Sequence, residues 1–149
     1  MMLNSNKPFV AAIPGAAIGV GFELAMLCDY RIGSTMAKMG DRHVALGLVP
    51  DSGAVITLPK VVGWANACKI LFTGEIFEAQ ELQEMGVLNE LVEPEELQQK
   101  TRAFAERISA NAPLATQMTK RLVRMAQQGD SAAILDYSYQ VMGTMMQTE

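Results

Sequence analysis

Short apolar runs and one apolar helical stretch make up the first forty residues of the chain. Residues 9–13 form an apolar run without polar alternation, which is typical of a strand covered on both faces of a parallel sheet. Residues 22–28 predict a buried helix, and residues 29–33 and 36–40 predict a second strand and a weaker third one. A strand, a helix and another strand in this order imply a right-handed crossover, so the pattern predicts an α/β architecture.

The hydrophobic pattern becomes irregular between residues 41 and 53, where two glycines and a proline interrupt it. Loops that a rigid sheet positions often carry function, so this segment is a candidate for part of a site. Helical spacing returns over residues 57–72 and ends at Gly74, a residue type common after the last helical turn. Residues 76–85 then predict a short helix, and residues 87–92 predict another strand.

Three longer helices follow, each with apolar side chains at helical spacing along one face. These stripes are Leu97, Thr101, Phe104 and Ile108; Leu114, Met118, Leu122 and Met125; and Ile134, Tyr137, Val141 and Met145. Methionine stripes at this spacing are core or partner surface far more often than ligand sites. Because no further helix covers the last stripe, we expect an interface with another chain or a segment outside this sequence. We therefore predict an α/β part in residues 1–74 and a helical region in residues 75–149.

Composition places the chain among globular proteins. It has 149 residues, half of them apolar, and a net charge of −4. No window contains the Lys and Arg cluster of a nucleic-acid surface, so we expect no nucleic-acid partner. Cys28 and Cys68 lie in apolar helical contexts without metal-ligand spacing, which predicts free thiols, no metal and a reducing cytoplasmic compartment. The N-terminus lacks a signal-peptide pattern, and an organelle matrix is the alternative location.

A membrane helix is one alternative explanation of the apolar residues 9–28. Their length and the Gly15-x-x-x-Gly19 spacing fit it. Pro14 and Glu23 interrupt the stretch, however, and no basic flank anchors it. A buried strand joined to a buried helix explains the same residues, so we expect no membrane partner.

The loop between this strand and helix carries candidate chemistry. Glycines at positions 15, 19 and 21 let a ligand approach the main chain closely. The following helix start offers unpaired N–H groups and a partial positive charge, with Glu23 in its first turn. A ligand that develops negative charge would be stabilised there. A dinucleotide loop is the alternative, but Leu24 stands where its third glycine would be.

Three ordered blocks of sequence resemble the crotonase superfamily, which comprises the enoyl-CoA hydratases and isomerases. They are KPFVAAIPGAAIGVGFELAMLCDYRIG, LGLVPDSGAVITLPKVVG and FTGEIFEAQELQEMGVLNELV. The resemblance implies a crotonase-like α/β fold of strand–strand–helix turns with a helical C-terminal region that forms trimers or hexamers. It also implies an acyl-CoA substrate, with coenzyme A as part of that substrate and no other cofactor.

The resemblance also implies roles for individual residues. The Val20 N–H, between Gly19 and Gly21, matches the second donor to the thioester oxygen as it becomes an enolate. Glu23 matches the first of the two catalytic glutamates of the hydratases, and its alternative reading is a charge favoured by a helix N-terminus.

Two further candidates depart from the hydratase pattern. His43 stands where a hydratase has its second glutamate; a histidine can exchange protons near neutral pH, and it can also be structural. Asp51 stands where family isomerases often have a carboxylate, although Pro-Asp-Ser-Gly is also an ordinary turn. Since the second glutamate is absent, these residues favour isomerase-type proton transfer over hydration by a small margin. Asp41 is predicted to be a turn residue.

The chain corresponds to the central and C-terminal part of a family domain. We therefore expect the N-terminal half, with the first oxyanion donor and most coenzyme A loops, to be absent. This leaves an alternative function, in which the chain is an inactive fragment or a truncated module that only binds acyl-CoA or forms oligomers.

Overall fold

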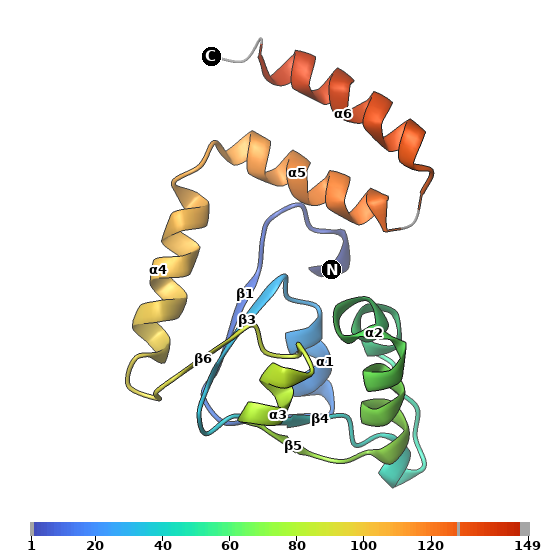
Figure 1. The fold of residues 1–149 in the computed structure, drawn as a ribbon, viewed down its shortest axis with the longest axis vertical. Helices are drawn as coiled ribbons and strands as arrows, with labels where there is room; N and C mark the ends of the chain where they lie inside the picture. Colours follow the sequence, from blue (N-terminus) through green and yellow to red (C-terminus); the bar gives the residue numbers. More distant parts are fainter. Residues whose placement is uncertain (1, 128, 147–149) are drawn as a thin grey trace. The chain divides into compact units, whose positions relative to one another are not determined.

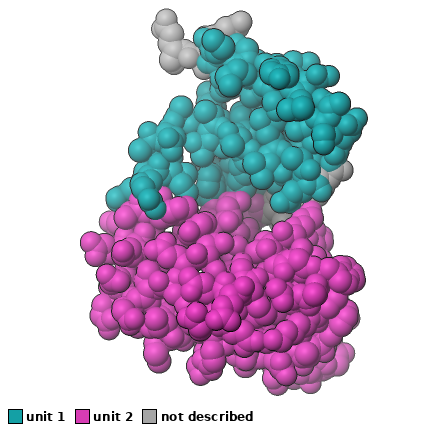
Figure 2. All heavy atoms as spheres, viewed as in Figure 1, with its two compact units in different colours: residues 1, 3–8, 105–149 teal, residues 2, 9–104 magenta. Residues whose placement is uncertain are grey.

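The computed structural model describes residues 2–127 and 129–146. The chain divides into two compact units, which Figure 2 shows in different colours. The larger holds residues 9–104 with residue 2, and the smaller joins residues 3–8 to the chain from residue 105 onward. This division differs from the predicted seam at Gly74, because residues 75–104 lie in the larger unit.

The larger unit contains two small sheets, visible in Figure 1. The first has strand order β1-β3-β6 and is parallel throughout. In the second, of order β2-β4-β5, β2 and β4 are parallel and β5 is antiparallel to β4. The strands are β1 (Val10–Ile13), β2 (Ala16–Ile18), β3 (Tyr30–Ser34), β4 (Lys38–Gly40), β5 (Phe77–Glu78) and β6 (Glu90–Val92).

Helices precede and connect these strands: η1 (Met2–Asn4), α1 (Val20–Met26), η2 (Val44–Leu46), α2 (Ala54–Thr73) and α3 (Ala79–Glu84). The predicted α/β order is confirmed, and four of its strands lie within about three residues of their predicted bounds. The sequence does not predict strand β2, because its three residues lie among glycines and form a strand by pairing with β4. Residues 76–85 were predicted as one helix, but they begin with β5, which exists through its pairing with β4.

The larger of two apolar clusters joins the sheets to the helices. Phe22 and Met26 from α1 pack with Leu58 and Ile70 from α2 and with Leu82 from α3, all fully or almost fully buried. Helix α1 contributes despite its length of two turns because its side chains are apolar on almost every face.

A buried arginine ties β3 to the chain before β6. The Arg31 guanidinium donates to the carbonyl oxygens of Val87 and Cys28, each at 2.6 Å, and to Oδ1 of Asn89 at 3.3 Å. Burial lowers the pKa of Arg31 from its ordinary value. The carbonyls compensate for removing this charge from water.

Helix α2 is long and apolar enough to suit a membrane span by length and composition. Its backbone breaks at Gly63, where φ is 77° and ψ is 167°, so two shorter helical pieces meet at a kink. A bilayer needs about 20 continuous helical residues. Leu58, Val62 and Ile70 of α2 are buried in the core, whereas other large apolar side chains of this helix are exposed: Val55, Ile56, Val61, Trp64 and Phe72.

The smaller unit consists mainly of α5 (Pro113–Ala126) and α6 (Ser131–Met145). Helix α4 (Leu97–Ser109) crosses the boundary between the units, and its Phe104 stacks on Tyr30 with ring centroids 4.2 Å apart. The three predicted helices are therefore confirmed. Exposed apolar side chains remain on the last two of them: Leu114, Val123, Leu135, Tyr139 and Met142.

A close backbone contact requires glycine at position 40. A Cβ on Gly40 would lie 2.2 Å from the Glu75 carbonyl oxygen, so an alanine would push β4 away from the segment that leads into β5. We predict that Gly40→Ala lowers the free energy of unfolding by about 1–3 kcal/mol, measured by urea denaturation.

Gly15→Ala is the matched control, because a Cβ there meets no atom within 4 Å. We expect it to change stability by no more than about 0.5 kcal/mol. Equal stability of the two variants would contradict the proposed contact.

Candidate active site

The C-terminal ends of the parallel strands β2 and β4 bring two loops side by side. Ile18 pairs with Gly40, and the Gly19 N–H continues the ladder by donating to the Gly40 carbonyl at 3.0 Å. From these ends the chain passes through Gly19 into α1 and from Gly40 into Asp41. Ligands of open α/β sheets bind beyond the carboxyl ends of the strands, so both loops lie where a site is expected.

Gly19 shapes the start of α1. Its φ of 58° and ψ of −120° lie in a region that favours glycine, and its carbonyl accepts the first helical hydrogen bond from the Glu23 N–H at 2.9 Å. The Val20 N–H therefore belongs to the first helical position, whose amide has no partner within the helix. Val20 itself is 53% exposed. This placement suits the predicted oxyanion donor, whose function stays a prediction.

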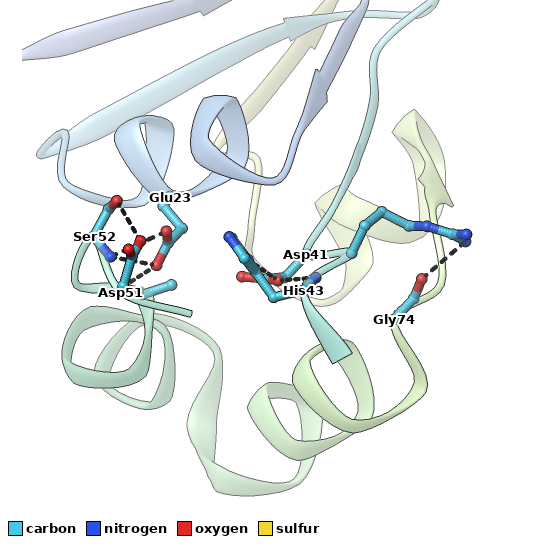
Figure 3. Close-up of polar contacts among 8 residues, drawn as sticks. Glu23, Asp41, His43, Asp51, Ser52 and Gly74 are labelled. Carbon is cyan, nitrogen blue, oxygen red and sulfur yellow. Dashed lines mark hydrogen bonds and ion pairs between the residues drawn. The ribbon is translucent and has the colours of Figure 1, made fainter. Parts of the chain in front are cut away.

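Glu23 lies one turn into α1, and its residue is fully buried. Both carboxylate oxygens accept the Ser52 N–H at 3.1 Å, and Oε1 also accepts the Ala54 N–H at 3.2 Å (Figure 3). The N-cap of α2 is Gly53, which has no side chain to bond these amides. Glu23 therefore caps α2 from a different helix, where a negative charge also complements the helix dipole.

His43 is held by the aspartate two residues before it. Its Nδ1 lies 2.6 Å from Asp41 Oδ1, and its backbone N–H donates to the same oxygen at 2.9 Å (Figure 3). The imidazole is 14% exposed and the Asp41 side chain 1%. The turn predicted for Asp41 is present, and the same carboxylate also binds the histidine ring.

Three sequence-predicted residues converge at this place. One side-chain atom from each of Glu23, His43 and Asp51 lies within 4.8 Å of the others. Asp51 is exposed, and its Oδ1 accepts the Ser52 hydroxyl at 3.1 Å. The structure thus brings together side chains from α1, the loop after β4 and the loop before α2.

The electrostatics of the cluster favour a charged imidazole. The hydrogen bond to Asp41 raises the pKa of His43 above its ordinary value, and the charges of Glu23 and Asp51 act in the same direction. Partial burial opposes them, but the net pKa shift is upward. A histidine in this setting can exchange protons over a range that begins near neutral pH.

These three side chains are also of types that bind metal ions such as Zn²⁺. Both oxygens of Glu23 already accept backbone N–H bonds, which leaves them less available as ligands. The arrangement therefore fits acid–base chemistry better than metal binding, and the expected absence of a metal stays a prediction.

Sequence reasoning missed two contributions to the site. The sequence predicts Asp41 as a turn residue only and gives no role to the Ser52 amide, which holds Glu23. The Asp-x-His spacing was a usable signal for the first, because it matches an Asp side chain that bonds two residues ahead. No sequence signal marks a backbone amide.

Comparison with known proteins agrees with this geometry. A profile of the family described as Enoyl-CoA hydratase/isomerase matches residues 1–149. The chain belongs to the enoyl-CoA hydratase/isomerase family. The predicted family and the crotonase-like α/β fold are therefore confirmed.

Relatives within this family differ in how much of their length the chain covers. It is 37% identical over 146 residues to a short-chain-enoyl-CoA hydratase of Clostridioides difficile, covering 98% of this chain and 94% of that one. It is 36% identical to a short-chain-enoyl-CoA hydratase of Clostridium acetobutylicum, covering 97% of this chain and 55% of the relative. A Thermobifida fusca YX structure in complex with CoA matches with a TM-score of 0.93 and 29% identity, over 97% of this chain and 56% of that one. The chain thus spans about half the length of the last two.

The capping role of Glu23 predicts a difference between two substitutions. Glu23→Gln keeps one oxygen that can accept from Ser52 and Ala54, whereas Glu23→Ala leaves both amides without an acceptor. We expect Glu23→Ala to lower the free energy of unfolding by about 1–3 kcal/mol more than Glu23→Gln, measured by urea denaturation. Equal losses would show that the carboxylate does not cap α2.

The raised pKa of His43 predicts a pH-dependent contribution to stability. A group whose pKa is higher in the folded state stabilises the fold fully below its unfolded pKa, about 6.5, and loses this contribution as pH rises through the folded value. We expect the stability difference between the wild type and His43→Gln to be largest at about pH 5–6 and to shrink above about pH 6.5. A difference that grows with pH would contradict this sign.

Proposed function

We propose that this chain, as part of an enoyl-CoA hydratase/isomerase, adds water across a carbon–carbon double bond conjugated to a coenzyme A thioester. The observation that carries the proposal is the convergence of Glu23, His43 and Asp51 within 4.8 Å, beside the start of α1. The C. difficile and C. acetobutylicum relatives are named short-chain-enoyl-CoA hydratases, which supports the substrate class. The CoA in the T. fusca structure supports a thioester ligand.

Hydration needs two proton-transferring groups and a site for developing negative charge. A base takes a proton from water, and the water oxygen forms a bond to the β-carbon. The electron pair of the double bond moves to the thioester oxygen as an enolate, which the Val20 N–H would stabilise. The enolate then collapses and its α-carbon receives a proton from an acid. Glu23 and His43 are the pair that would supply these two roles.

Isomerisation is the second candidate, favoured by the position of Asp51. Its exposed carboxylate can remove a proton from one carbon and return it to another without any water added. A shift of the double bond requires only one such group, so Asp51 acting with the Val20 N–H would be sufficient.

The assembly and location are also proposals. The exposed Tyr139 and Met142 of α6, with Met146 directly after it, support a trimer or hexamer, because an uncovered apolar face favours an interface. Cys28 and Cys68 form no disulfide with each other, which supports a reducing cytoplasmic compartment. We propose no cofactor beyond the coenzyme A of the substrate.

Purified protein with a 2-enoyl-CoA and with a 3-enoyl-CoA distinguishes the two reactions. Hydration removes the absorbance of the conjugated thioester and gives a product one water heavier, whereas isomerisation of the 3-enoyl substrate creates that absorbance without a change in mass. We expect hydration, and we expect Glu23→Gln to lower kcat by about 10²–10⁴-fold.

Glu95→Gln is the control, because it removes one exposed negative charge from the turn between β6 and α4. Turnover in Glu23→Gln equal to that of the control would refute the role of Glu23. Absence of turnover with both substrates would favour the alternative of a chain that only binds acyl-CoA or forms oligomers.

A further inference from the structure

The Asp41 carboxylate is buried, yet only one of its two oxygens accepts hydrogen bonds from the described residues. Within the part of the chain that the structure describes, its Oδ1 accepts two hydrogen bonds, both from His43. Its Oδ2 is buried and has no partner among these residues. A buried carboxylate without solvent depends strongly on the bonds that it does make, so the His43 ring is its main stabilising contact.

This contact determines which ring nitrogen is free. A carboxylate accepts hydrogen bonds and has no hydrogen to donate, so the short contact to Asp41 places the proton on Nδ1. Nε2 is then the nitrogen that gains or loses a proton. Among the described residues Nε2 has no hydrogen-bond partner, which leaves it available to a ligand beside Glu23 and Asp51.

We propose that Asp41 is a positioning residue: it fixes the Nδ1–H tautomer of His43, so that Nε2 exchanges the proton that the missing second glutamate would otherwise exchange. The proposal rests on the proposed function for its role in turnover. The turn itself does not require an aspartate at position 41, because its backbone N–H bond would form with any short polar side chain.

The charged groups around the ring set how it titrates. Asp41 comes from the same loop, Glu23 from α1 and Asp51 from the loop before α2, and all three favour the imidazolium form. Arg42, between Asp41 and His43, donates to the Gly74 carbonyl at 3.2 Å. Of the three carboxylates, only Asp41 is hydrogen-bonded to the ring, so it fixes the tautomer while the other two act through charge alone.

The chain has one histidine, so its titration can be followed without ambiguity. We would label the protein with ¹⁵N-histidine and record the ring nitrogen shifts across pH. In the wild type we expect the neutral ring to carry its proton on Nδ1. Asp41→Asn keeps acceptors for the turn but removes the charge, so it should lower the pKa of His43 and allow the Nε2–H tautomer. Glu95→Gln should change neither.

Kinetics test the role in turnover. For Asp41→Asn we expect kcat to fall at least about tenfold, with KM within about twofold of wild type, because the ring is misoriented for proton transfer rather than for binding. The limb of the pH–rate profile that reports His43 should move down in parallel with the NMR titration. His43→Gln should lower kcat by about 10²–10⁴-fold.

Each outcome decides a separate statement. An Nε2–H tautomer in the wild type, or an unchanged titration in Asp41→Asn, overturns the tautomer assignment whatever the activity. An altered titration with unchanged kcat and pH profile overturns the role in catalysis. If the wild type turns over neither substrate, the proposed function fails while the NMR result still decides the tautomer. If Asp41→Asn does not fold, Asp41→Ser keeps a turn-forming oxygen and takes its place.

Discussion

The Glu23 carboxylate is fully buried, and its two oxygens bond the Ser52 and Ala54 amides at the start of α2. Without this contact, a buried negative charge and an uncapped helix terminus would both be unsatisfied. The contact therefore fixes α1 against α2 and orders the loop that carries Asp51. The position of Asp51 relative to Glu23 depends on it.

The candidate site is built from loops on a small rigid frame. Two parallel strands, β2 and β4, end together, and the bond from Gly19 to Gly40 continues their pairing up to the point where the loops separate. From there, one loop leads to the N–H groups of α1 and the other to Asp41 and His43. Groups that must cooperate in proton transfer are thus held by backbone pairing rather than by long flexible side chains.

His43 stands where the family's hydratases have their second glutamate, and this difference changes the charge of the site. A histidine carries a positive charge when protonated, and here it lies among three carboxylates, which stabilise that form. Asp41 accompanies this change: its buried oxygen accepts from the ring and limits the orientation of the imidazole. A second glutamate in place of His43 would instead add a fourth carboxylate to a partly buried cluster.

The sequence by itself determined the family, the α/β order, the main helices and the identity of Glu23, His43 and Asp51 as candidates, because these follow from local periodicity and from ordered blocks of residues. It did not reveal β2 or β5, since two or three residues form a strand only when a distant partner pairs with them. It also placed the unit boundary at Gly74, whereas residues 75–104 pack with the sheets through contacts that span many residues. Only the tertiary structure decided that Glu23 caps α2 and that Asp41 holds His43, because both depend on which backbone amides and ring atoms come within hydrogen-bond distance once the strands are paired.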